Sequence, residues 1–146
     1  MRILLITIGI FMINTVNGQD LQKHRWENRI VLLISRNDDS KEYLAQMDEF
    51  SGFSKELEDR KLFIYQVLPL QYRTVNYPLN ADQNKWISSS GLYTKYTGRE
   101  NKFKVILIGL DGGIKLEKFG VLTSEELFKT IDSMSMRRAE MQNKSK

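Results

Sequence analysis

The chain of 146 residues contains no cysteine and only one histidine. Without a thiol it has no thiolate nucleophile, no resolving cysteine and no cysteine ligand for a metal ion. Disulfide exchange and thiol-based peroxide reduction both pass through a cysteine sulfur. A thiol oxidoreductase mechanism is therefore excluded, whatever the fold.

The chain also lacks a block of charge of one sign. Its 22 basic and 18 acidic residues are interspersed and leave a net charge of +4. Nucleic-acid-binding chains typically gather basic residues in one segment, so we expect no nucleic-acid partner.

With this length and 41% hydrophobic residues, the chain is expected to form one domain around one core.

The longest apolar stretch lies at the amino terminus. Arg2 precedes a run from Ile3 to Ile13, and the small residues Val16 and Gly18 follow. This order is typical of a secretory signal peptide, with cleavage expected before Gln19. An uncleaved anchor is the alternative, but a run of about 11 residues is shorter than the roughly 20 that a spanning helix needs. We therefore expect an exported protein, periplasmic or secreted.

Cleavage at this point would divide the chain into a signal peptide (1–18), a folded domain (19–136) and a polar basic tail (137–146). Since there is no cysteine to carry a lipid, we expect no membrane anchor and no transmembrane segment after cleavage. The basic side chains of the tail are interpreted as a solvated end, with contact to an acidic partner as the alternative; they are Arg137, Arg138, Lys144 and Lys146.

The first half of the chain has a β-α-β pattern. The segment Arg29–Ser35 is almost entirely aliphatic, which favours a central strand covered on both faces. Apolar residues then recur at spacings of three and four, which predicts a helix over 40–60, with Asp39 at its start and a bend at Gly52. A second strand follows at Leu62–Pro69. The connection is long enough for parallel pairing.

The second half has the pattern of a hairpin followed by a helix. The segment Phe103–Phe119 contains two strand-like runs around a glycine-rich turn. Thr123 and Glu126 form a capping box that opens a helix. Between the halves, residues 70–102 show little periodicity, although a short helix is expected near Leu92–Tyr96.

This order of elements resembles the thioredoxin fold. "ENRIVLLIS" resembles the strand that leads to the redox loop, and "YTKYTGRENKFKVILIGLDGGIKL" resembles the stretch that carries a cis-proline before the hairpin. In that alignment residues 36–40 lie at the redox loop and Phe103 occupies the place of the proline. Because a cis bond before a non-proline residue costs about 2.5 to 4 kcal/mol, the peptide before Phe103 is expected to be trans.

Three segments, "LQKHRWENRIVLLI", "FKVILIGLDGGIKL" and "IDSMSMRRAEM", give a closer resemblance over Leu21–Met141. Together they resemble a peroxiredoxin- and thioredoxin-like domain of unknown function, the DUF4174 type. That type occurs in exported bacterial proteins and in the sushi-repeat and coiled-coil-containing matrix proteins of animals. One departure is Ser135, which stands where a turn proline is expected. The resemblance implies an α/β, thioredoxin-like fold with a mixed central sheet and brings no established activity.

The resemblance also implies where a ligand would bind. In this fold the carboxyl end of the central strand, the start of the first helix and the loop before the hairpin meet at one edge. A peptide or a small polar ligand is the expected occupant. The candidate residues are Arg36, Asn37, Asp38 and Phe103, with Tyr93 and Tyr96 as apolar contacts.

An alternative recognition patch lies before the central strand, where Arg25, Trp26 and Arg29 place two guanidinium groups beside an indole. Such a patch would suit a carboxylate or a sugar-like ligand. The structural interpretation is favoured, in which Trp26 covers one end of the sheet and an arginine stacks on it. The aromatic residues of the middle segment either line a binding surface or close the core; they are Tyr72, Tyr77, Trp86, Tyr93 and Tyr96.

Catalytic and metal sites have little support in the sequence. His24, the only histidine, would have to recruit one of the serines at 88–90, and none has the G-x-S-x-G setting of an activated nucleophile. A metal site from His24, Asp38 and Asp39 lacks regular ligand spacing, and the two aspartates suit a helix amino terminus. We expect no metal ion and no cofactor.

The expected function is therefore a non-redox binding or interaction module of the cell envelope or extracellular space, with a protein or small polar ligand as partner. One alternative is an enzyme that uses the peroxiredoxin-like scaffold for hydrolysis or transfer without thiols. Another is a relic of peroxide handling that pairs with a cysteine-bearing partner. A closed pocket with convergent polar groups would favour an enzyme, and an open aromatic surface would favour an interaction module.

The first prediction concerns processing. Expressed in a host with a secretion pathway, the protein should be recovered outside the cytoplasm with its amino terminus at or near Gln19, because the apolar run has the length of a signal peptide. Intact mass and cell fractionation check this. A full-length, membrane-embedded product would contradict it.

Overall fold

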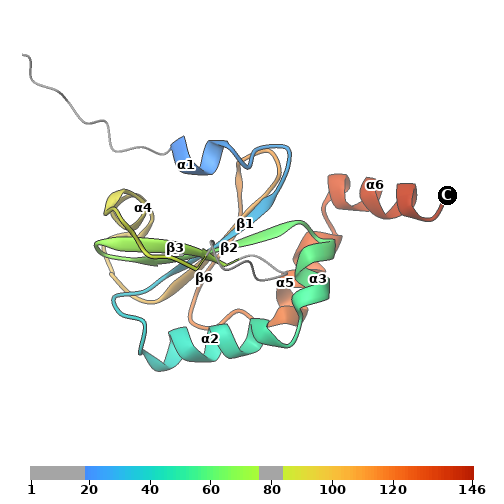
Figure 1. The fold of residues 1–146 in the computed structure, drawn as a ribbon. Helices are drawn as coiled ribbons and strands as arrows, with labels where there is room; N and C mark the ends of the chain where they lie inside the picture. The colour runs from blue at the N-terminus through green and yellow to red at the C-terminus, as the bar shows by residue number, and fades with distance from the viewer. Residues whose placement is uncertain (1–18, 76–83) are drawn as a thin grey trace, which may run out of the picture.

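The computed structural model describes residues 19–75 and 84–146, so the expected signal peptide and Tyr77 lie outside the described residues. A six-stranded sheet in the order β4-β3-β2-β1-β5-β6 forms its centre (Figure 1). The strands are β1 (Arg29–Ile34), β2 (Leu62–Leu68), β3 (Gln71–Val75), β4 (Ile87–Ser88), β5 (Lys104–Ile108) and β6 (Ile114–Phe119). The helices are α1 (Gln19–Gln22), α2 (Lys41–Ser51), α3 (Ser54–Asp59), α4 (Gly91–Tyr96), α5 (Ser124–Asp132) and α6 (Ser135–Lys144).

The pairing of the strands makes the sheet mixed. β1 runs parallel to β2 and antiparallel to β5, and β5 and β6 form an antiparallel hairpin. The predicted β-α-β unit, linking helix, hairpin and final helix are all present in this order. The predicted thioredoxin-like α/β fold is confirmed.

Strand β1 is the centre of the molecule, and all six of its residues are buried. Val31 and Leu33 face one cluster of core residues, which includes Phe50 of α2 and Ile131 of α5. The alternate residues of β1 face a second cluster, which includes Leu92 of α4. Figure 1 shows the corresponding helices on the two sides of the sheet. The continuous aliphatic run is explained by this double cover.

The predicted helix over 40–60 is interrupted near the predicted bend at Gly52, so it forms two elements rather than one. Its residues form α2 and α3, which are separated at Gly52 and Phe53. Phe53 leaves helical geometry, and its ring packs edge-on against Phe128 with the centroids 5.6 Å apart. The helix begins at Ser40 as predicted, but the side chain of Ser40, rather than that of Asp39, caps it by accepting the N–H of Tyr43 at 3.3 Å. Tertiary packing therefore overrides the helical periodicity.

Two side chains of α2 fasten it to the start of α5. The buried amide of Gln46 donates to the carbonyl oxygen of Leu122 at 2.8 Å and accepts from the N–H of the same residue at 2.7 Å. Glu49 accepts the N–H of Ser124 at 2.7 Å. Thr123 accepts the N–H of Glu126 at 3.2 Å, which is the side-chain cap that the sequence predicted. These contacts fix α2, whose first turn borders the candidate site.

The middle segment contains two strands that periodicity did not predict. β3 pairs with β2 over five residues, and β4 adds two residues at the edge of the sheet. Tyr72 of β3 is buried and stacks on Tyr65 at 5.8 Å between centroids, while Tyr93 and Tyr96 pack against the same cluster. These tyrosines close the core. Trp86 instead lies under the Arg73 guanidinium, 4.5 Å from its ring centroid.

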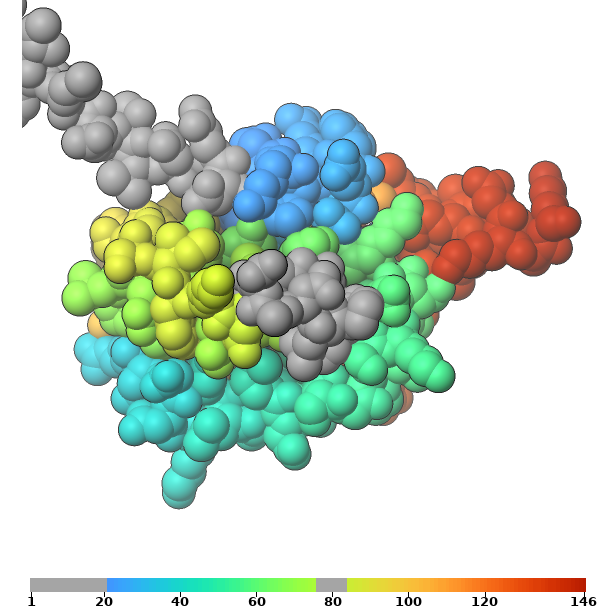
Figure 2. All heavy atoms as spheres, viewed as in Figure 1, coloured from blue at the N-terminus to red at the C-terminus, as the bar shows by residue number. Residues whose placement is uncertain are grey.

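The interpretation of Arg137 as part of a solvated tail is wrong. Residues 135–144 form α6, which extends from the body of the molecule (Figure 2). Arg137 is buried and forms ion pairs with Asp59, Asp132 and Glu140. Hydrogen bonds from Lys144 and Arg137 lower the pKa of Asp59 to about 2. Ser135, where a turn proline was expected, is the first residue of α6.

A second arginine is buried within the same group of charges. Arg29 opens β1, is only 1% exposed, and donates to the backbone oxygen of Arg60 at 3.0 Å and to Glu140 at 3.3 Å. The carboxylate of Glu140 thus lies between Arg29 and Arg137.

Among the residues that the structure describes, no helix combines the length and the apolar character needed to cross a membrane.

The second prediction concerns the contact between α2 and α5. Gln46→Ala should lower the free energy of unfolding by about 2–5 kcal/mol, because it leaves the buried N–H and carbonyl of Leu122 without partners. Leu44→Ala on the same helix is the control and should cost less than about 1 kcal/mol, since Leu44 is 54% exposed. Urea denaturation measures both. Equal losses would show that the Gln46 bonds are not required.

Candidate ligand-binding groove

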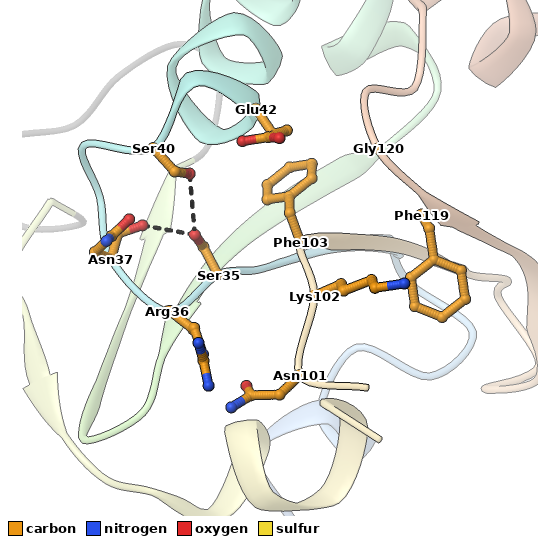
Figure 3. Close-up of a pocket in the computed structure, with 10 residues that line it drawn as sticks. All are labelled: Ser35, Arg36, Asn37, Ser40, Glu42, Asn101, Lys102, Phe103, Phe119 and Gly120. Atoms are coloured by element: carbon orange, nitrogen blue, oxygen red, sulfur yellow. Dashed lines mark hydrogen bonds between the residues drawn. The ribbon is translucent and has the colours of Figure 1, made fainter. Parts of the chain in front are cut away.

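A groove of about 320 Å³ lies where β1 ends, α2 begins and the loop before β5 passes (Figure 3). This is the edge at which the thioredoxin resemblance placed the ligand. The groove is lined by Ser35, Arg36, Asn37, Ser40, Glu42, Asn101, Lys102, Phe103, Phe119 and Gly120. Three of the predicted residues, Arg36, Asn37 and Phe103, are brought together here.

The loop after β1 is held by hydroxyl groups. Ser35 Oγ donates to the carbonyl oxygen of Asn37 at 2.6 Å and lies 3.4 Å from Ser40 Oγ. Ser40 in turn caps α2. Residues 36–39 therefore form a closed polar turn at the position that the alignment gives to the redox loop.

The two loops of the groove are joined by Arg36 and Asn101. With the Asn101 amide oriented to match its neighbours, its oxygen accepts from Arg36 Nη2 at 2.9 Å and from Nε at 3.0 Å. Its nitrogen donates to Thr97 and to the hydroxyl of Tyr93. Asn101 has a φ of +50°, a left-handed conformation that asparagine adopts more readily than most residues. We name this contact the Arg36–Asn101 clasp.

The apolar part of the groove consists of two phenylalanine rings. Phe103 is partly buried and packs against the core cluster, whereas Phe119, at the end of β6, is 52% exposed. Figure 3 shows Phe103 on the loop that also carries Asn101 and Lys102, and Phe119 on the other side of this loop from Arg36. The groove thus offers a guanidinium and two aromatic rings to the same ligand.

Three of the predicted residues lie elsewhere. Asp38 is exposed and does not line the groove. Tyr93 stands behind the clasp, where its hydroxyl contacts the Asn101 amide. Tyr96 lines a different cavity at the opposite end of β1, together with Arg25. Both tyrosines lie on the six-residue helix α4, and their different directions could not be derived from spacing alone.

Sequence reasoning missed Asn101 and Phe119 as groove residues. The position of Asn101 in the loop before the hairpin is a signal that could have identified it, because asparagine is favoured where the backbone turns left-handed. Phe119 gave no such signal, since it was interpreted only as the end of the hairpin. Its place in the groove depends on the pairing of Phe119 with Lys104 at the start of β5.

The groove contains few of the side chains that covalent catalysis uses. The residues that line it include no histidine, and Glu42 is their only carboxylate. The Ser35 hydroxyl donates to a backbone carbonyl, and the Ser40 hydroxyl is used as a helix cap. Neither serine is bonded to a base that could activate it. Among the described residues that line the groove, no serine is therefore an activated nucleophile.

His24 has a structural role. Its Nε2 lies 2.7 Å from the Tyr65 hydroxyl, and its Nδ1 lies 3.3 Å from the side-chain oxygen of Asn28. Burial lowers the pKa of His24 below its usual value, so the neutral ring is favoured. Both ring nitrogens have partners other than the serines at 88–90. Within the described ranges, no group of three or more acidic or histidine side chains could hold a metal ion.

The alternative patch is only partly formed. The Arg25 guanidinium lies over the indole of Trp26, 5.2 Å from the ring centroid, and Trp26 is 58% exposed. Arg29 cannot join this patch, because it is buried and bonded to Glu140. The prediction that Arg29 belongs to an exposed recognition surface is therefore wrong. The predicted stacking of an arginine on Trp26 is confirmed, but the exposed indole does not close the end of the sheet.

Comparison with known proteins agrees with the fold. A family model described as "Domain of unknown function (DUF4174)" matches residues 20–140. Among solved structures, the chain is similar to the reduced 2-Cys peroxiredoxin of Plasmodium vivax, with a TM-score of 0.56 and 9% sequence identity over 82% of this chain and 84% of that one. At this identity the likeness shows the fold alone. None of the curated proteins matches.

The third prediction separates the two roles of Asn101. Asn101→Gly and Asn101→Ala both remove the clasp, but alanine is also strained at a φ of +50°. Alanine should therefore cost about 1 kcal/mol more of unfolding free energy than glycine. Chemical denaturation of the two variants measures the difference. A glycine variant as unstable as the alanine variant would show that the backbone at this position carries no strain.

Proposed function

Because the chain belongs to the DUF4174 family and has a thioredoxin-like fold without a thiol, we propose that it is a non-redox binding module of the cell envelope or extracellular space. The ligand lies in the groove at the carboxyl end of β1. The supporting observation is the Arg36–Asn101 clasp, which holds a guanidinium beside the apolar wall of the groove.

The clasp prepares Arg36 for a ligand. Asn101 uses Nε and one proton of Nη2, and among the described residues Nη1 has no hydrogen-bond partner. A guanidinium fixed in this way can donate to a carboxylate or carbonyl oxygen with less loss of side-chain freedom. Arg36 is therefore the residue that would recognise a polar group of the ligand.

The size and lining of the groove define the class of ligand. A volume of about 320 Å³ lies at the lower end of the range for small-molecule sites. Phe103 and Phe119 provide apolar contact, and the closed turn at residues 36–39 provides polar edges. A peptide segment or a small polar ligand with one apolar group matches this arrangement. Export, inferred from residues 1–18, would place the partner outside the cytoplasm.

The alternative is an enzyme that performs hydrolysis or transfer without thiols. Glu42 is the one observation that favours it, because a carboxylate beside an open groove can act as a general base. A base alone is insufficient for covalent catalysis, since no activated nucleophile lies next to it. A binding module needs only the side chains that already line the groove, whereas a covalent enzyme would also need an activated nucleophile.

The fourth prediction tests the groove. Arg36→Ala combined with Phe119→Ala should weaken capture of the partner from the native envelope fraction about tenfold or more, because a charged hydrogen bond and an aromatic contact are lost. Phe119 is preferred to Phe103, which also packs against the core. The free energy of unfolding should fall by no more than about 2 kcal/mol, since both side chains are exposed and the main loss is the Arg36–Asn101 clasp.

The matched control is Arg25→Ala combined with Trp26→Ala, which removes an exposed arginine and an exposed aromatic ring at the other end of β1. Quantitative affinity capture compares the three proteins. The control should retain the partner. Capture that survives the groove variant and is lost in the control would place the binding surface at Arg25 and Trp26 and refute the groove.

A further inference from the structure

A second cavity lies at the opposite end of β1 from the groove. It has a volume of about 80 Å³ and lies between the end of α1 with the segment that follows it, the end of α4 and the turn between β5 and β6. Three segments far apart in the sequence thus build one site. Its lining comprises Leu21, Gln22, His24, Arg25, Asn28, Ile30, Lys95, Tyr96, Ile108, Gly109 and Gly112.

The charge of this cavity is of one sign. Arg25 and Lys95 reach it from different segments, and the residues that line it include no aspartate or glutamate. Across 19–75 and 84–146, the ion pairs found in the structure involve neither of these cations. Each lies over a ring instead, Arg25 over Trp26 at 5.2 Å and Lys95 over Tyr96 at 5.1 Å from the centroid. The lining of this cavity thus contains two cationic residues and no anionic one.

The backbone next to Arg25 has an unusual conformation, and the facing turn leaves room for its side chain. Trp26 has a φ of +69°, which is unusual for a bulky residue. Its N–H donates to the carbonyl oxygen of Leu110 at 2.7 Å, so this backbone conformation is tied to the turn after β5. Gly112 faces Arg25, and a Cβ there would lie 3.9 Å from Arg25 Cδ. Glycine also permits the φ of +82° at this position.

The remaining polar residues can complete a hydrogen-bonded site. Gln22 and Asn28 bring amide groups to the lining, and His24 forms a buried wall through its bond to Tyr65. A volume of about 80 Å³ holds only a few water-sized groups. It therefore suits a single charged group and excludes a peptide or a sugar ring.

We propose that this cavity binds a small anion, a phosphate or carboxylate group, held by Arg25 and Lys95. The anion supplies the counter-charge that the cavity lacks. Either a free anion or the phosphate of a lipid headgroup provides this chemistry. The site is separate from the groove of the proposed function, so either can fail without the other.

The test uses His24, which lines the cavity and is the only histidine of the chain, so its imidazole protons form a single reporter in the NMR spectrum. Inorganic phosphate added to the folded protein at constant ionic strength should shift these signals in a saturable way. In a second arm, phosphatidylglycerol vesicles replace phosphate, with phosphatidylcholine vesicles as the neutral comparison. A response to phosphate identifies a free anion, and a response only to the anionic vesicles identifies the headgroup.

The decisive variant is Arg25→Gln combined with Lys95→Gln, which should weaken the binding about tenfold or more, because two charged hydrogen bonds become neutral. Lys23→Gln is the matched control, since Lys23 is an exposed cation of the same segment that does not line the cavity. It should bind like the unchanged protein. Arg36→Ala should also bind normally, which separates this site from the groove. Absence of any response, or an equal response in the double variant, would overturn the proposal.

Discussion

Strand β1 is buried along its whole length, and the rest of the structure follows from that constraint. An aliphatic strand with neighbours on both edges has to be covered on both faces. The helices α2, α3 and α5 cover one face, while α1 and α4 cover the other. Arg29 is buried together with the rest of β1, and burying its guanidinium charge would lower the stability of the fold unless a carboxylate paired with it. Glu140 of α6 supplies that carboxylate, so α6 is needed to neutralise a charge inside the body of the molecule.

The parts of the fold that the sequence predicted are those with local and redundant signals. The aliphatic run of β1, the alternation of the hairpin and the cap at Thr123 each reflect an interaction within a few residues. β3 and β4 had no such signal, because β3 alternates imperfectly and β4 pairs over two residues only. The division between α2 and α3 depends on the distant ring of Phe128. Patterns within one segment cannot report a contact of that kind.

The candidate site shows the same contrast between what a local pattern can predict and what depends on contacts between distant segments. Arg36, Asn37 and Phe103 were predicted together because the resemblance implied a thioredoxin-like topology, in which the end of β1 and the loop before β5 meet at one edge. Asn101 was missed because its importance lies in a backbone conformation and in a contact with Arg36. Arg29 was misplaced because an arginine beside exposed residues looks exposed, although its position in β1 turns it into the interior.

The attachment of α6 has a consequence for how far the folding unit extends. The helix is joined to the body mainly through charged groups, and Arg137 is the only residue of α6 that is buried. A polypeptide shortened at Met136 would keep every apolar residue of the two core clusters. It would nevertheless lack Glu140, so the buried charge of Arg29 would have no carboxylate partner. The hydrophobic core therefore ends before α6. A fragment that is to be purified as a stable unit nevertheless has to include Glu140.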